Sequence, residues 1–125
     1  MILSVGVDIV KIARFEGMTE HFIARVFTPN ERAYLQTKNH ISAAGLFAAK
    51  EAVAKALGTG FSGFWPSDIE ITHDTNGRPE VNLLNEAALV AKKLMASKQQ
   101  QTYAISLSIS HTDSDAIAFV VISAG

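Results

Sequence analysis

The chain has 125 residues, 48% of them hydrophobic and 18% charged, which predicts a single globular domain over residues 1–125. Its formal net charge of −1 gives no overall field that would attract nucleic acid or an anionic membrane. The chain lacks cysteine, which excludes disulfides and thiolate chemistry, and it lacks a membrane-span or signal-peptide pattern, so the cytoplasm is the expected location.

The first segment, residues 3–10, is apolar and β-branched on both sides, which predicts a buried strand. Asp8 interrupts this run near its end. Because an unpaired buried charge is very costly, this carboxylate needs a partner. Three explanations are open: Asp8 caps the following turn, forms a salt bridge, or binds a metal ion.

Residues 11–38 are predicted to be helical in two pieces. The mixture of apolar and charged residues over 11–25 suits a turn and a short helix. Thr28-Pro29-Asn30-Glu31 has the capping-box pattern, so a second helix should run from there to about Lys38. Basic residues outnumber acidic ones in this region. It therefore presents either a basic face to an acidic protein or an ordinary solvated surface.

Residues 42–57 are predicted to form one alanine-rich helix that ends at Gly58 as its C-cap. Successive residues on a helix are rotated by about 100°, which gives this helix two contrasting faces. The face predicted to pack in the core consists of Leu46, Ala49, Val53 and Leu57. The other face carries Phe47, Glu51 and Lys55.

Glu51 and Lys55 place an acid and a base one turn apart. The simpler interpretation is a solvated ion pair worth ~0.3–0.5 kcal/mol. The alternative is a functional site, which a ligand or a neighbouring chain approaches over the short side chains of Ala44, Ala48 and Ala54. Lys50 points about 100° away and is expected to serve structure or an interface.

The second half of the chain is predicted to supply most of the strands. Residues 69–72 and 81–83 alternate around a turn that contains Asn76-Gly77, which is typical of a hairpin. Residues 86–98 have helical spacing, residues 105–109 alternate as a half-buried strand, and residues 116–122 should be a central strand. The fold class is therefore α+β, an antiparallel sheet with helices packed on it.

Three motifs carry a resemblance to a known family: Gly6-Val7-Asp8-Ile9, the run from Phe47 to Gly60, and Ser108-Ile109-Ser110-His111. In this order and spacing they resemble the holo-[acyl-carrier-protein] synthases, the small phosphopantetheinyl transferases. The likeness covers essentially the whole chain and implies the 4′-phosphopantetheinyl transferase-like fold. It also implies a homotrimer with its active sites between subunits.

The resemblance implies a reaction. The family moves 4′-phosphopantetheine from coenzyme A to a serine of apo-acyl carrier protein, releases adenosine 3′,5′-bisphosphate, needs Mg²⁺ and serves fatty acid biosynthesis. Asp8 and Glu51 match the metal-binding positions, which suits a cation that prefers carboxylate and phosphate oxygens. Glu51 is also expected to accept the serine proton. Lys55 is expected to act in catalysis by holding a phosphate oxygen.

Further positions are matched residue by residue. Lys55, Gly58, Ser110 and His111 are expected to bind coenzyme A, and Arg14 and Arg25 to contact acyl carrier protein. Family members usually have arginine where this chain has Leu46, so that contact is absent or supplied elsewhere. The alternative function is a non-catalytic module that binds a carrier protein or a nucleotide.

Overall fold

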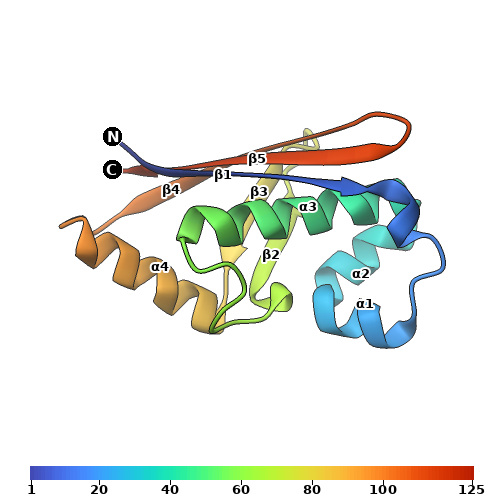
Figure 1. The fold of residues 1–125 in the computed structure, drawn as a ribbon, viewed down its shortest axis with the longest axis horizontal. Coiled ribbons are helices and arrows are strands. Elements are labelled where there is room, and N and C mark those ends of the chain that lie inside the picture. Colours follow the sequence, from blue (N-terminus) through green and yellow to red (C-terminus); the bar gives the residue numbers. More distant parts are fainter.

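A long central helix, α3 (His40–Leu57), lies under a three-stranded antiparallel sheet with the strand order β1-β5-β4 (Figure 1). The computed structural model describes all residues from 1 to 125. The other elements are β1 (Ile2–Lys11), η1 (Ile12–Phe15), α1 (Glu20–Val26), α2 (Pro29–Leu35), η2 (Pro66–Asp68), β2 (Ile69–His73), β3 (Pro79–Leu83), α4 (Asn85–Ser97), β4 (Tyr103–His111) and β5 (Asp115–Ala124). This arrangement confirms the predicted α+β class, with β2 and β3 forming a separate two-stranded sheet. No helix is both long enough and apolar enough to cross a membrane.

The local signals in the sequence set the helix ends. In α2, the Thr28 hydroxyl accepts from the Glu31 amide at 3.2 Å, and the Glu31 carboxylate accepts from the Thr28 amide at 2.9 Å. This is the predicted capping box. Helix α3 begins at His40, two residues before the predicted start, because the Asn39 side chain caps it. It ends at Gly58, whose φ of 87° is the left-handed conformation that glycine adopts without strain.

The small residues of α3 bring the helix backbone close to β1. At Gly6, an added Cβ would lie 2.0 Å from the Ala52 carbonyl oxygen, so no larger residue fits there. Ala44, Ala48 and Ala54 are all fully buried. The expectation that these three alanines admit a ligand or a neighbouring chain is therefore wrong: they lie inside the protein and let its elements pack closely.

The outer face of the three-stranded sheet is apolar and exposed. Val5, Val7 and Ile9 on β1 are 54%, 49% and 62% exposed. On β5, Phe119 lies opposite Val7 and is 47% exposed. The prediction of a first strand buried on both sides is wrong within one chain, because β1 is an edge strand with nothing over this face. The prediction of a central C-terminal strand is correct, since β5 lies between β1 and β4.

Candidate active site

Asp8 lies on the inner face of β1, where α3 packs against the strand. Its side chain is 15% exposed, and its Oδ1 atom is 2.8 Å from the Lys55 Nζ atom. Lys55 also donates to the Val7 carbonyl oxygen at 3.0 Å, while its side chain remains 52% exposed. Of the three explanations for Asp8, the structure shows the salt bridge.

Glu51 lies on the same face of α3 as Lys55 but does not pair with it, because the lysine reaches to Asp8 instead. The simple ion pair along the helix is therefore not formed. Burial raises the pKa of Glu51, and the nearby Asp8 carboxylate raises it further, while Lys55 and Arg14 act in the opposite direction. Asp8 and Glu51 are 43 positions apart in the sequence, yet their carboxylates are close enough to repel each other, and the Lys55 ammonium group interacts with both.

Arg14 lies on η1 with its guanidinium 5.7 Å from the centre of the Phe47 ring, one turn before Glu51 on α3. It is exposed, and its charge acts on Glu51. Sequence reasoning placed Arg14 only at a docking surface. The structure puts it beside the carboxylate pair as well.

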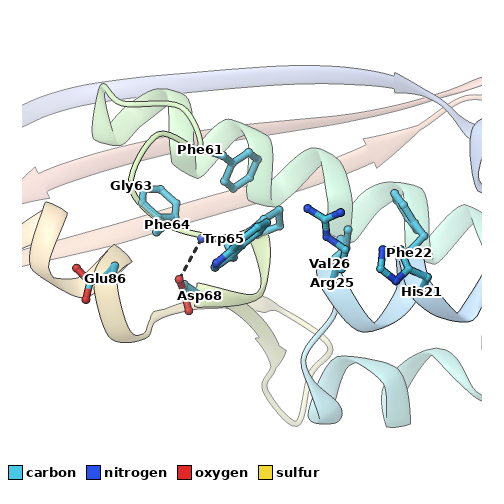
Figure 2. A pocket seen from close by; sticks show the side chains of 11 residues that line it. His21, Phe22, Arg25, Val26, Phe61, Gly63, Phe64, Trp65, Asp68 and Glu86 are labelled. Atoms are coloured by element: carbon cyan, nitrogen blue, oxygen red, sulfur yellow. Dashed lines mark hydrogen bonds between the residues drawn. The ribbon is translucent and has the colours of Figure 1, made fainter.

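Arg25, the other residue expected to bind a partner, lies over the Trp65 ring at 5.0 Å from its centre. Both residues line a pocket of about 680 Å³ between α1, the segment 61–66 and α4 (Figure 2). Sequence reasoning did not find this pocket. The only signal was the concentration of aromatic residues between Gly60 and Pro66.

The residues expected to bind coenzyme A do not meet in one chain. Gly58 follows the C-terminal end of α3, near Lys55. His111 instead lines a pocket of about 230 Å³ with Ser42 and Leu46, near the start of α3. Ser110 is exposed on β4 and pairs with Ile117, on the outer face of the sheet. In a single chain, the residues expected to bind coenzyme A therefore fall into two separate groups: Lys55 with Gly58, and Ser110 with His111.

Leu46, at the position where family members usually have arginine, lines the pocket at His111. Leu46 is only 2% exposed and contributes an apolar wall. His73 lies in the same pocket and stacks on the Tyr34 ring, with 4.2 Å between ring centres. Burial, aided by Lys38, lowers the pKa of His73, so the uncharged imidazole is favoured. The His111 Nδ1 atom lies 3.2 Å from the Thr112 carbonyl oxygen.

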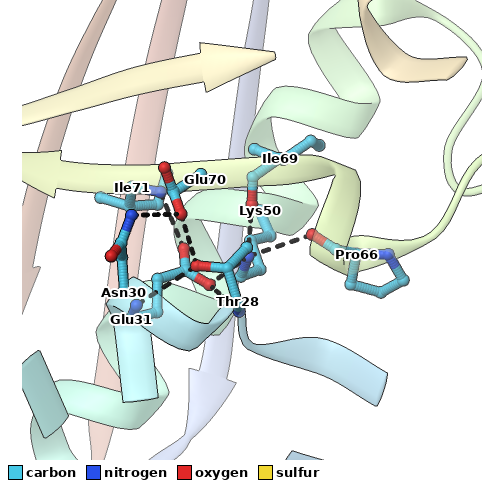
Figure 3. A network of polar contacts seen from close by, with 8 residues as sticks. All are labelled: Thr28, Asn30, Glu31, Lys50, Pro66, Ile69, Glu70 and Ile71. Atoms are coloured by element: carbon cyan, nitrogen blue, oxygen red, sulfur yellow. Dashed lines mark hydrogen bonds and ion pairs between the residues drawn. The ribbon is translucent and has the colours of Figure 1, made fainter. Parts of the chain in front are cut away.

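Lys50, the neighbour of Glu51 in α3, belongs to a buried polar network (Figure 3). Its Nζ atom is 2.7 Å from Glu31 Oε1, and both side chains are completely buried. It also donates to the carbonyl oxygens of Pro66 and Ile69. The second Glu31 oxygen accepts from the Ile71 amide at 2.7 Å. Lys50 thus has the structural role expected for it, and it joins α3 to α2, η2 and β2.

The chain is similar in sequence and in structure to proteins of one known family. The sequence profile of the 4′-phosphopantetheinyl transferase superfamily matches residues 4–108. A holo-[acyl-carrier-protein] synthase of Clostridium kluyveri is 49% identical, over 97% of this chain and 90% of the relative. A holo-[acyl-carrier-protein] synthase of Caldicellulosiruptor saccharolyticus is 45% identical, over 97% of this chain and 96% of the relative.

Solved structures give the same result. The holo-ACP synthase of Plasmodium yoelii superimposes with a TM-score of 0.82 at 31% identity, covering 100% of this chain and 97% of that one. The synthase of Bacillus anthracis in complex with coenzyme A (3′,5′-ADP) superimposes with a TM-score of 0.80 at 33% identity. The match covers 100% of this chain and 99% of that one. The chain therefore belongs to the 4′-phosphopantetheinyl transferase superfamily and, within it, to the holo-[acyl-carrier-protein] synthases.

Proposed function

We propose that this protein transfers 4′-phosphopantetheine from coenzyme A to a serine hydroxyl of apo-acyl carrier protein, in the cytoplasm and in the service of fatty acid biosynthesis. The serine oxygen attacks the phosphorus next to the pantetheine arm, and the bond to the second phosphate breaks. Adenosine 3′,5′-bisphosphate leaves. The observation that carries the proposal is the meeting of Asp8 from β1 with Glu51 and Lys55 from α3 on one partly exposed surface.

The donor set at this surface fits Mg²⁺. Asp8 and Glu51 both supply oxygen ligands. Burial and, after it, the repulsion from Asp8 raise the pKa of Glu51, and a divalent cation would relieve that repulsion. No third His, Asp or Glu completes a cluster with them. Mg²⁺ sites commonly combine one or two carboxylates with substrate phosphates and water. When bound, the ion would neutralise charge on the pyrophosphate.

The protein's own groups have distinct roles in the proposed reaction. The Glu51 carboxylate is the base that takes the proton from the serine hydroxyl, and its raised pKa brings it closer to that task. The Lys55 ammonium, now paired with Asp8, is exposed enough to bind a phosphate oxygen as a point charge. Arg14 and Arg25 are exposed cations, available to an acidic carrier protein.

We also propose a homotrimer with its sites between subunits. The apolar outer face formed by Val5, Val7, Ile9 and Phe119 is a contiguous exposed patch of the kind that marks protein contacts. Ser110 lies on this same face. In the proposed trimer, a neighbouring chain covers this face, and the residues expected to bind coenzyme A are divided between two subunits.

Two measurements test the proposal. Incubation with coenzyme A, Mg²⁺ and apo-acyl carrier protein should add the mass of phosphopantetheine to the carrier, and chelation of the metal should prevent this gain. Sedimentation should give a trimer, and Phe119→Asp should dissociate it with loss of transfer, because a charge cannot be buried unpaired. Carrier binding without any mass gain, unaffected by Asp8→Ala, would instead identify a non-catalytic module.

A further inference from the structure

The pocket at His111 contains no permanently charged side chain. Its volume is about 230 Å³, which suits part of a ligand rather than a whole small molecule. None of the 11 residues that line it is a lysine, arginine, aspartate or glutamate. Leu46, which is only 2% exposed, forms an apolar wall together with Ile41 and Ile109. A ligand group in this pocket therefore meets apolar surface and neutral hydrogen-bonding groups.

The two histidines of the pocket favour a flat, neutral ring. His73 stacks on Tyr34 with an interplanar angle of 9°. Burial, aided by Lys38, lowers the pKa of His73, which favours its neutral imidazole. The His111 Nδ1 atom is held by the Thr112 carbonyl oxygen, so its other ring nitrogen remains for a ligand. Such groups can stack on a heterocycle such as adenine or form hydrogen bonds with it.

The first turn of α3 borders the pocket, but its amides already have partners. The Ile41 amide donates to the Asn39 side chain at 3.0 Å, and the Ser42 amide donates to the Asn39 carbonyl oxygen at 3.1 Å. The Ser42 hydroxyl remains as a neutral donor. This helix end therefore does not offer a phosphate group the free backbone amides of the two residues that line the pocket.

Three cations lie near the pocket but do not line it, and all three are exposed. The Lys38 Nζ atom is 5.3 Å from the centre of the Tyr34 ring. Lys11 is 72% exposed and pairs with Asp115. Arg78 lies on the turn between β2 and β3. Water and salt screen charges of this kind, so each one contributes little to the binding of an anion.

An arginine in place of Leu46 would put a permanent charge into the wall of the pocket. A guanidinium group binds phosphate with two parallel hydrogen bonds and stays charged when it is buried. Leu46 can do neither. The site expected to hold the nucleoside end of coenzyme A therefore has the shape for a ring but lacks a buried cation for a phosphate group.

We propose that, because of Leu46, this protein gains little from the 3′-phosphate of coenzyme A and also uses 3′-dephospho-coenzyme A as a donor. The inference rests on the proposed function and on the expected role of His111 in binding coenzyme A. The serine oxygen attacks the phosphorus that carries the pantetheine arm, the bond to the second phosphate breaks, and the serine proton passes to Glu51. With this donor the leaving group is adenosine 5′-monophosphate.

The experiment compares coenzyme A and 3′-dephospho-coenzyme A as donors to apo-acyl carrier protein at about pH 8.5, where histidine is ordinarily uncharged. In wild type, kcat/KM for the two donors should differ by less than about tenfold, the most that exposed charges provide. Leu46→Arg should raise the preference for coenzyme A by at least about tenfold, through charge-assisted hydrogen bonds to the 3′-phosphate. Leu89→Arg is the matched control, because Leu89 is 50% exposed on α4 and does not line this pocket.

Calorimetry with adenosine 3′,5′-bisphosphate and adenosine 5′-monophosphate tests the same inference without carrier protein or turnover. Wild type should bind the two nucleotides with dissociation constants within about tenfold of each other, and Leu46→Arg should favour the bisphosphate. A larger wild-type preference for the 3′-phosphate in either assay would overturn the inference. So would equal donor ratios in Leu46→Arg and Leu89→Arg, or failure of wild type to bind either nucleotide.

Thermal melts show whether Leu46→Arg folds. If it does not, the wild-type comparisons in both assays decide the inference by themselves. Absence of transfer from both donors would overturn the proposed function, whereas the calorimetric comparison would still measure whether the 3′-phosphate contributes to binding.

Discussion

Lys50 and Glu51 are neighbours in the sequence, yet they lie in opposite environments. Lys50 is completely buried against an equally buried Glu31, with two carbonyl oxygens completing its hydrogen bonds. Glu51 is partly exposed and unpaired, and it is close enough to Asp8 for their charges to repel. One residue along a helix turns a side chain by about 100°, from the core to the surface.

The difference shows how the same residue types serve structure or chemistry. A buried ion pair with every partner in place has nothing left to bind, and its charges are fixed by their surroundings. A partly exposed carboxylate with a like-charged neighbour has unused acceptors and a shifted pKa, which are properties of reactive sites.

The largest effect on folding should come from Lys50→Met. Glu31 would then be a buried carboxylate without its cation, and loss of one partner of such a pair costs roughly 3–5 kcal/mol of unfolding free energy. Urea denaturation measures it. The double variant Lys50→Met/Glu31→Gln should recover part of the loss, because it removes the buried charge, and the glutamine oxygen can still accept from one of the two backbone amides, of Thr28 and Ile71, that donate to Glu31. Equal stability of the single and double variants would contradict this role.

Glu51→Gln should slow the reaction and leave the fold intact. Because it removes the proposed general base, transfer should slow by about 10²–10⁴-fold, or ~2.7–5.4 kcal/mol of transition-state stabilisation. Stability should not fall. The raised pKa means that the Glu51 contribution to stability is present at acid pH and is lost as pH rises through its folded pKa, so a neutral glutamine removes a small cost at neutral pH. The transfer rate with coenzyme A and the thermal melting temperature, measured on the same samples of wild type and Glu51→Gln, check the predicted rate and the predicted stability.

The acid side of the pH profile should follow Glu51. Its pKa is raised by burial and by Asp8, so protons should compete with Mg²⁺ at a higher pH than they would for an ordinary glutamate. Titration of Mg²⁺ affinity should therefore show a loss as pH falls through this raised pKa. Asp8→Asn should move the midpoint to lower pH, since it removes the repelling charge. A midpoint at the ordinary glutamate value would argue against a coupled pair.

Arg14→Ala should have the smallest effect. Exposed charges at an interface govern association rate and its salt dependence, so kcat/KM for the carrier protein should fall by only about two- to tenfold and depend less on salt. Because Arg14 also lowers the pKa of Glu51, the variant should shift the acid limb slightly upward. Arg32→Ala, an exposed arginine on α2, is the control.

Several features could be predicted because they depend on local chemistry. The capping box at Thr28 and Glu31 and the glycine that ends α3 follow from neighbouring backbone groups. The two faces of α3 follow from helical periodicity, and Leu46, Ala49 and Val53 are buried as predicted. The family resemblance of the motifs that carry Asp8, Glu51 and Lys55 predicts that these residues share a site, and the structure brings the three side chains together.

What only the tertiary structure decided are contacts between distant segments. The sequence cannot show that Lys55 pairs with Asp8 rather than with Glu51, because that depends on how closely β1 approaches α3 at Gly6. Nor can it show that Glu31, recognisable as a cap, also neutralises a buried lysine. Periodicity specifies which face a side chain takes on its own element. Its partner across the core is fixed by packing, which involves the whole chain at once.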